Sequence, residues 1–134
     1  MTFYQIKLQS FKRAIYSNHA QLKTARGIRK YTDTHYWENL DLDDLSRNLY
    51  VSKYHMLRLF KQYYGQTPRQ YLIDQRIEAS KEKLKSGMSV TQCCFTVGFE
   101  SPGSFRTLFK SRTGKTASQY QKEQFSRSNS SKQF

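Results

Sequence analysis

The sequence predicts an all-α fold of about seven helices, in which two helix-turn-helix motifs are joined by a long linking helix. Three observations support this prediction: helix caps recur along the chain, one two-helix unit occurs twice, and turn-forming residues are scarce. The 134 residues include only two prolines and six glycines, which is too few for a turn-rich β-sandwich. The hydrophobic fraction is 37%, so the core must be small.

Capping residues mark the helix boundaries. Serine, threonine and aspartate favour N-caps because their side chains accept hydrogen bonds from free backbone N–H groups, whereas glycine ends helices and proline begins them. Such signals occur at Asp41, Ser52, Thr67-Pro68, Ser89, Ser101-Pro102 and Thr116, with helix ends or breaks at Gly65, Gly87, Gly98 and Gly114. They predict a first motif at 42–64, a linking helix at 68–85, a second motif at 89–113 and a last helix at 116–124.

The two ends of the chain differ from this central region, which we place at 25–125. Residues 1–24 form a basic extension with an ambiguous pattern, since apolar residues at 3–8 could form a short strand and those at 11–22 a weak helical stripe. Residues 126–134 read SRSNSSKQF, a polar composition that predicts a disordered tail.

The central region contains an internal repeat. A shift of 49 residues places Ser52 on Ser101 and the string Leu59-Phe60-Lys61 on Leu108-Phe109-Lys110. Upstream of these serines the shift becomes 48, so the second copy has one extra residue near Gly98. Each copy is a short helix, a tight turn and a serine-capped second helix, which is the layout of a helix-turn-helix motif.

The charge pattern points to a polyanionic partner. The formal net charge is +13, and segments 45–73 and 101–122 each hold five basic residues and no acid. Lysine and arginine placed against phosphates release counterions from nucleic acid. Because Lys61 aligns with Lys110 and both copies are rich in basic residues without acids, we interpret these basic residues as one repeated binding face.

Outward-facing positions of the two second helices supply the candidate site. The candidate base-reading residues are Tyr54, Leu57, Arg58, Gly103, Ser104, Arg106 and Thr107, and the candidate phosphate contacts are Lys53, Lys61 and Lys110. Arginine pairs bidentately with guanine, although Arg58 could also contact a phosphate. Tyr54 could contact a base, pack on a sugar or simply pack against protein. Leu57 could meet a thymine methyl or a neighbouring helix.

The linking helix suggests how both motifs could bind one duplex. Its 18 residues span about 27 Å at 1.5 Å per residue. A rod of that length can hold two reading helices about one DNA turn (~34 Å) apart. A single chain could therefore occupy a non-palindromic site as a monomer.

Across residues 28–120 the chain resembles the DNA-binding domain of the AraC/XylS family of bacterial transcription regulators. The matching strings are Leu42-Asp-Asp-Leu-Ser46, Ser52 through Lys61 with Gly65, Tyr71-Leu72 with Arg76 and Ala79, Val97-Gly-Phe99, and Phe105 through Lys110 with Gly114. The resemblance implies seven helices, two helix-turn-helix motifs and promoter binding in a bacterial cytoplasm, at the nucleoid. It also implies an activator that contacts RNA polymerase.

Three positions depart from the family pattern. Cys94 replaces a usual alanine, Ala117 a helix-starting proline and Gln121 an arginine. Gly103 has no side chain with which to read a base, so the second motif could hold phosphates more than it reads sequence.

Arg76 lies in the joint between the motifs, where we interpret it as structural and able to pair with an acid.

Other function classes are less consistent with the sequence. A low-specificity nucleoid-associated or RNA-binding protein would have the same charge and stays an alternative. An enzyme is not expected, because the acids lie at helix starts and the three histidines are scattered; no metal or other cofactor is expected either. Adjacent Cys93 and Cys94 are interpreted as core residues. No membrane partner is expected, since no apolar run approaches ~20 residues.

Residues 1–27 are too few for the separate effector domain that family members often carry. We therefore expect either a short stand-alone regulator or part of a longer chain.

Overall fold

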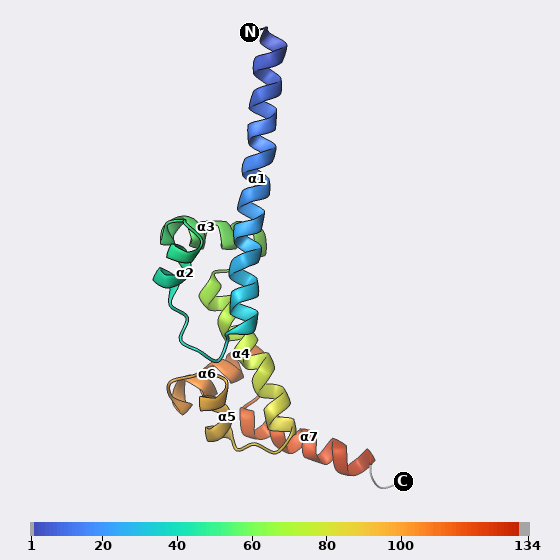
Figure 1. The fold of residues 1–134 in the computed structure, drawn as a ribbon. Helices are drawn as coiled ribbons and strands as arrows, with labels where there is room; N and C mark the ends of the chain where they lie inside the picture. The colour runs from blue at the N-terminus through green and yellow to red at the C-terminus, as the bar shows by residue number, and fades with distance from the viewer. Residues whose placement is uncertain (1, 132–134) are drawn as a thin grey trace. The chain divides into compact units, whose positions relative to one another are not determined.

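The computed structural model describes residues 2–131, apart from the side chains of residues 14–17, 130 and 131. This part of the chain forms seven α-helices and no strand (Figure 1). They are α1 (Phe3–Thr34), α2 (Leu42–Asn48), α3 (Lys53–Tyr64), α4 (Pro68–Lys85), α5 (Val90–Thr96), α6 (Pro102–Thr113) and α7 (Ala117–Ser131). The predicted all-α class with two helix-turn-helix motifs and a long linking helix is confirmed.

The helices belong to two compact units. The first unit contains α1 and residues 41–68, and so holds α2 and α3. The second unit contains residues 35–40 together with the chain from Arg69 onward. The segment between α1 and α2 is therefore part of the second unit, although both helices that it connects belong to the first.

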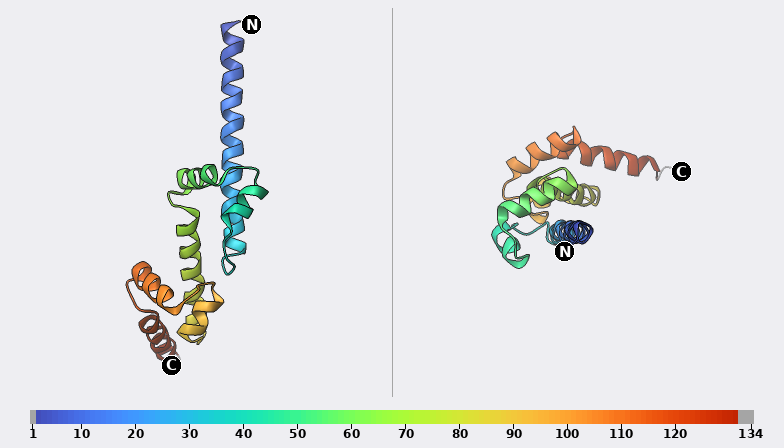
Figure 2. Two further views of the ribbon diagram at one scale, coloured as in Figure 1. Left: turned by 90° about the vertical axis from the view of Figure 1, so that its left-hand side faces the viewer. Right: turned by 90° about the horizontal axis from the view of Figure 1, so that it is seen from above.

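The core of the first unit is formed where α1 packs on α3. Ala25 and Ile28 of α1 are fully buried, as are Met56 and Phe60 of α3. Tyr63 of α3 is half-buried, and its hydroxyl donates to the backbone carbonyl of Asn18 at 3.4 Å. Toward its N-terminus, α1 continues well beyond the part that α3 covers (Figures 1 and 2).

The core of the second unit is built around a cluster of aromatic rings that meet tilted or edge to face. Phe105 lies 5.3 Å from Phe99 and 5.7 Å from Phe109, between ring centroids, and Phe109 lies 5.6 Å from Tyr120. Around them pack buried residues of α4, of α5 with its C-cap, and of α7, namely Ile77, Leu84, Cys93, Cys94, Val97 and Ala117. Both cysteines are buried and unbridged, which confirms their interpretation as core residues.

Five of the predicted N-caps form in the structure. Asp41 accepts from the backbone N–H groups of Asp43 and Asp44 at 3.0 and 3.1 Å. Ser52, Ser89, Ser101 and Thr116 each accept from the N–H three residues further on. Gly65 and Gly114 end α3 and α6 in the left-handed conformation, with φ of 73° and 80°.

Both ends of the chain are more helical than the sequence indicated. The ambiguous extension at 1–24 is helical from Phe3 onward, and α1 continues through the expected boundary at 25. No glycine or proline occurs between residues 2 and 26, so nothing interrupts that helix once its C-terminal half is packed.

The predicted disorder from residue 126 also differs from the structure, because α7 runs to Ser131. Serine and asparagine are only a few tenths of a kcal/mol poorer helix formers than better residues, and no breaker follows Gly114. Residues 132–134 of the predicted tail lie outside the described residues.

Candidate nucleic-acid interface

The outward face of α3 presents a tyrosine and an arginine one helical turn apart. Tyr54 is 75% exposed, and the guanidinium carbon of Arg58 lies 6.0 Å from the centroid of its ring. The Arg58 Nη2 atom also lies 3.4 Å from Nδ1 of His55. These contacts limit the conformations of Arg58, so its charge is held over the N-terminal half of α3.

The other candidates on α3 surround this pair. Lys53 and Lys61 are exposed, whereas Leu57 is half-buried. The Lys53 ammonium lies 3.7 Å from the Asp43 carboxylate, and both side chains are at least half exposed. Such exposed ion pairs contribute little stability, so a phosphate can replace the carboxylate as the partner of Lys53.

The two motifs turn in the same way. Val51 donates to the carbonyl of Ser46 at 3.1 Å, and Phe99, 48 residues later, donates to the carbonyl of Cys94 at 3.0 Å. The residue before each donor has a positive φ: Tyr50 at 56° and Gly98 at 103°. The first motif therefore holds a tyrosine in a conformation that favours glycine.

The beginning of α6 is poor in side chains that can reach a ligand. Gly103 is exposed and has open space around it. The hydroxyl of Ser104 lies 3.1 Å from the hydroxyl of Ser101, which also caps the helix through the Ser104 N–H. Arg106 and Thr107 are exposed one turn further along.

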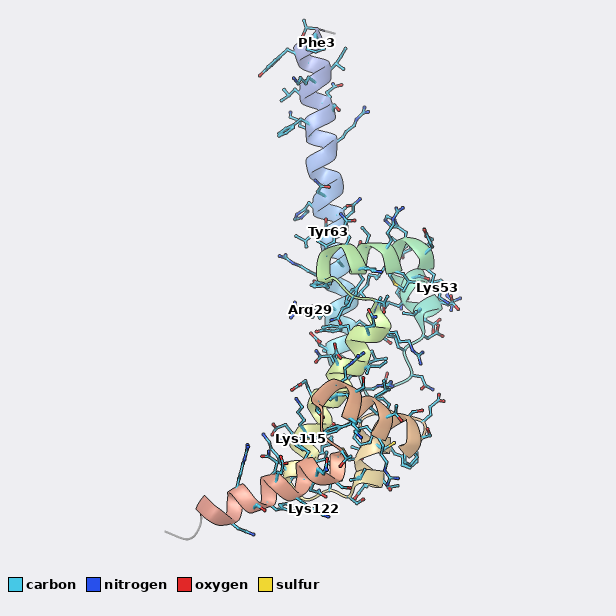
Figure 3. The ribbon with its side chains drawn as sticks, turned by 180° about the vertical axis from the view of Figure 1, so that it is seen from behind. Phe3, Arg29, Lys53, Tyr63, Lys115 and Lys122 are labelled. Carbon is cyan, nitrogen blue, oxygen red and sulfur yellow. The ribbon has the colours of Figure 1, made fainter. Side chains whose placement is uncertain are left out.

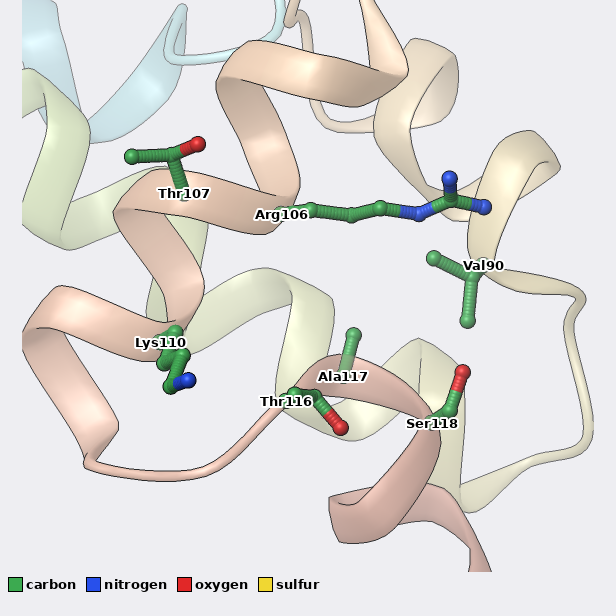
Figure 4. A pocket seen from close by; sticks show the side chains of 7 residues that line it. All are labelled: Val90, Arg106, Thr107, Lys110, Thr116, Ala117 and Ser118. Carbon is green, nitrogen blue, oxygen red and sulfur yellow. The ribbon is translucent and has the colours of Figure 1, made fainter.

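Arg106, Thr107 and Lys110 line a hollow of about 250 Å³ in the second unit, together with Val90 of α5 and the start of α7. Figure 4 shows the side chains of α6 on one side of this hollow and Thr116, Ala117 and Ser118 on the other. A helix N-terminus carries partial positive charge. The hollow therefore combines two cations with a favourable helix end, which suits an anion such as phosphate. The sequence had not indicated Val90, Thr116 or Ser118 as lining residues; Thr116 was visible only as an N-cap.

The structural interpretation of Arg76 agrees with its contacts, although its partners are not acids. Its Nε donates to the carbonyl of Tyr36 at 2.6 Å and its Nη2 to the carbonyl of Glu38 at 2.8 Å. The guanidinium also lies 5.5 Å from the centroid of the Phe99 ring. Burial lowers the pKa of Arg76 from its usual value, and the nearby charge of Arg69 lowers it further. Arg76 thus joins segment 35–40 to α4 and to the turn of the second motif.

Gln121, where the family pattern has an arginine, also contacts backbone carbonyls. Its Nε2 donates to the carbonyls of Leu84 at 3.0 Å and Met88 at 2.7 Å. Those groups lie at and just beyond the C-terminal end of α4, where carbonyls lack partners within the helix. The amide therefore caps α4 from α7, a contact that the sequence did not reveal.

Within residues 2–131 no group of three or more histidine, cysteine or acidic side chains is placed to hold a metal ion. None of the helices in that range is long and apolar enough to cross a membrane.

Two serine-capped second helices with exposed basic faces, each preceded by the same turn, define a helix-turn-helix protein with two motifs. A family model described as a helix-turn-helix domain matches residues 45–123. The chain belongs to the AraC/XylS family, as a DNA-binding domain of its transcription regulators.

Relatives and solved structures agree with this assignment. The chain is 33% identical over 94 residues to the bifunctional transcriptional activator/DNA repair enzyme AdaA of Bacillus subtilis, covering 69% of the chain and 44% of AdaA. It is 38% identical over 72 residues to the regulator YbfI of the same species, covering 54% of the chain and 26% of YbfI. The chain thus spans less than half the length of these two relatives.

Among solved structures, the DNA-binding domain of the global transcriptional factor AdpA, in complex with a target DNA, has a TM-score of 0.71 at 26% identity. That match covers 77% of the chain and 94% of the AdpA domain. The C-terminal domain of AraT, a response regulator from Geobacillus stearothermophilus, has a TM-score of 0.70 at 27% identity, covering 75% of the chain and 84% of that domain.

Proposed function

We propose that this protein is a sequence-specific regulator of transcription that inserts α3 and α6 into successive major-groove turns of double-stranded DNA. The observation that carries the proposal is the repetition of one exposed basic helix, with the same turn before it, in both units. The target DNA bound to the similar AdpA domain supports double-stranded DNA as the partner.

The candidate residues divide into two roles in this proposal. Arg58, supported by Tyr54 and Leu57, reads base edges from α3. Gly103, Ser104, Arg106 and Thr107 face the second groove, where the short side chains at the start of α6 leave Arg106 as the longest reader. Lys53, Lys61 and Lys110 contact phosphates, which position a protein without specifying sequence.

In the proposed complex, the hollow beside α6 supplies a binding site for a DNA phosphate. Arg106 and Lys110 face it from α6, and the start of α7 closes it (Figure 4). A DNA phosphate placed there would neutralise both cations. Arg106 could then contact backbone rather than bases, which would give the second motif less sequence preference than the first.

The chain is proposed to bind as a monomer on an asymmetric site. Both reading helices lie in one chain, and α4 contributes 18 residues, or about 27 Å of helix. We further propose that it acts as an activator contacting RNA polymerase, on nucleoid DNA in the bacterial cytoplasm. The similar protein AdaA is a transcriptional activator, which supports the activator role. Its effect would arise from binding and not from catalysis.

A second candidate is low-specificity nucleic-acid binding. The observation that favours it is the beginning of α6, where Gly103 and Ser104 offer little for base reading. If the first motif were equally permissive, the charge of the chain would still bind DNA strongly at low salt.

Selection from a random duplex library, followed by titration of the selected and a scrambled duplex at two salt concentrations, distinguishes the two. Sequence-specific binding predicts a preference of at least ~10³ for the selected duplex. A preference near one at both salt concentrations would favour the second candidate. Sedimentation of the complex then tests stoichiometry: one chain per selected duplex is expected, and two chains on a palindrome would contradict the monomer.

A further inference from the structure

The N-terminal part of α1 exposes a row of large apolar side chains. Tyr4 is 73% exposed, Leu8 40% and Phe11 64%. Successive spacings of four and three residues put these three on one face of the helix, in the a/d pattern of a coiled coil. Further along α1, at 100° per residue, Leu22 falls in line with this row, whereas the fully buried Ala25 lies to one side of it. We call the exposed row formed by Tyr4, Leu8 and Phe11 the α1 stripe.

The α1 stripe lies beyond the part of α1 that α3 contacts. The hydroxyl of Tyr63, near the end of α3, reaches α1 at Asn18. Figure 3 shows Tyr63 beside the middle of α1 and Phe3 at the far end of the helix. The stripe is therefore open to a partner that does not compete with the packing of the first unit.

The charges beside the stripe are all positive. At 100° per residue, Lys7 and Lys12 fall on either side of it, at the g and e positions. Residues 2–32 contain no acidic side chain. In coiled coils, charges at these positions select the partner and its orientation.

We propose that the α1 stripe is a docking surface for an amphipathic helix whose apolar stripe is flanked by acidic residues. Leu8 and Phe11 supply the apolar contact, while Lys7 and Lys12 pair with the partner's carboxylates. Charge complementarity selects this partner over a second copy. In a parallel pair of α1 helices Lys7 would face Lys12, and in an antiparallel pair each lysine would face its own counterpart, so both arrangements juxtapose like charges.

The same pattern disfavours a membrane surface. A helix that lies on a membrane separates a wide apolar face from a charged face. Here Lys7 falls between Phe3 and Phe11 around the helix, and Ile6 lies on the opposite side from the stripe, so the two kinds of residue are not separated. A narrow stripe with lysines at its edges suits another helix.

The test uses the full chain and a synthetic three-heptad peptide with leucine at a and d and glutamate at e and g. Fluorescence anisotropy of the labelled peptide should show saturable binding that weakens as salt is raised. A matched peptide with lysine at e and g should not bind. Binding of neither peptide, or of both equally, overturns the proposal.

Variants connect the binding to the stripe. The double substitution Leu8→Ala/Phe11→Ala should weaken binding of the acidic peptide by at least ~10-fold, since both apolar contacts are lost. Ile6→Ala, on the other side of the helix, is the control and should leave the affinity unchanged. Lys7→Glu/Lys12→Glu should reverse the preference in favour of the lysine peptide. Far-ultraviolet circular dichroism checks that each variant keeps its helices.

Two other measurements test competing occupants. Sedimentation of the chain alone should show no dimer that Leu8→Ala/Phe11→Ala dissolves; such a dimer would assign the stripe to a second copy. Vesicles of mixed phosphatidylcholine and phosphatidylserine should not displace the acidic peptide, and displacement that depends on Leu8 and Phe11 would assign the stripe to a lipid surface. Either result would overturn the proposal, and neither depends on DNA binding.

Discussion

The backbone of Trp37 passes so close to Gly98 that a Cβ atom on that glycine would lie 2.7 Å from the Trp37 carbonyl oxygen and 3.0 Å from Nε of Arg76. Gly98 also has a φ of 103°, which side chains rarely adopt. Segment 35–40 is thus packed against the turn of the second motif through a contact that only glycine permits.

Gly98→Ala should therefore destabilise the protein strongly. Positive φ costs an L-residue about 1–3 kcal/mol, and the clash involves a backbone carbonyl that cannot rotate away. We expect a loss of at least about 2 kcal/mol in urea unfolding monitored by circular dichroism. The matched control is Gly103→Ala, which has open space in α6 and should stabilise by up to about 1 kcal/mol. Equal effects of the two alanines would refute this account.

Arg76→Lys tests the second contact that holds segment 35–40 against the second motif. Lysine keeps the charge but lacks the planar fork that reaches the carbonyls of Tyr36 and Glu38 together. Because hydrogen bonds from charged groups contribute about 1.5–3 kcal/mol, we expect a loss in that range from chemical denaturation. Arg69→Lys, at an exposed position of the same helix, should change stability by less than about 0.5 kcal/mol. If Arg76→Lys left the stability unchanged, a single hydrogen bond to segment 35–40 would be enough to hold it.

Tyr50→Gly should stabilise the first motif. Tyr50 is 95% exposed and has a φ of 56°, so it contributes little packing and pays the steric cost of the left-handed region, about 1–2 kcal/mol. Glycine removes that cost but loses about 0.5–1 kcal/mol more conformational entropy. The expected net gain is about 0.5–1 kcal/mol, measured as a shift in the urea midpoint. Tyr54→Gly, at an exposed helical position, should instead destabilise by about 0.5 kcal/mol.

The buried thiols should be unreactive while the protein is folded. Burial raises the pKa of Cys93 to about 11 and raises that of Cys94 as well, so both stay protonated at neutral pH, and the thiolate is the reactive form. A thiol reagent at pH 8 should label the cysteines only after denaturant is added. Rapid labelling of the folded protein would contradict their burial.

The same shift predicts the direction of a pH dependence. The thiol pKa of Cys93 is higher in the folded state than in the unfolded state, so its contribution to stability is complete below about pH 9 and is lost as the pH rises toward 11. The urea midpoint should therefore fall across that window. Cys93→Ala should show a smaller fall than the parent protein; an identical fall would assign the dependence to other groups.

Arg58 and Lys110 should affect DNA binding in different ways. Arg58→Ala should weaken binding to the selected duplex by about 1–3 kcal/mol and relax preference at one or two base pairs. Lys110→Ala should weaken the selected and scrambled duplexes alike and lower the salt slope by about one. Titration of both variants against both duplexes at two salt concentrations measures each effect.

The opposite pattern would exchange the roles. If Arg58→Ala weakened both duplexes equally, Arg58 would be a phosphate contact. If Arg106→Ala then changed base preference most, sequence reading would reside in the second motif.

Much of the fold could be predicted because its signals are local. A cap depends on one side chain and the backbone N–H groups two or three residues away, so Asp41, Ser52 and Ser101 could be assigned without tertiary information. The exposed and buried faces of α3 follow from helical periodicity. The candidate residues on α3 and α6 could be named for the same reason, although their division into base and phosphate contacts is still a prediction.

The features that the sequence did not reveal depend on contacts between distant residues. The sequence suggested an acid as a partner for Arg76, whereas the fold supplies the carbonyls of Tyr36 and Glu38, some 40 residues earlier. Gln121 caps the end of α4 from α7, and no local pattern marks such a pair. The helical extension of α1 was equally ambiguous, because short apolar runs fit a strand or a helix.

By itself the sequence determined the helix boundaries in the centre of the chain, the repeated motif and its basic face, since these follow from capping, periodicity and charge. Only the tertiary structure decided that segment 35–40 joins the second unit, that Gly98 must be glycine, and that α6 and the start of α7 share a hollow. Backbone carbonyls and close approaches have no sequence signature of their own, because every residue carries the same backbone and only the fold brings particular groups together.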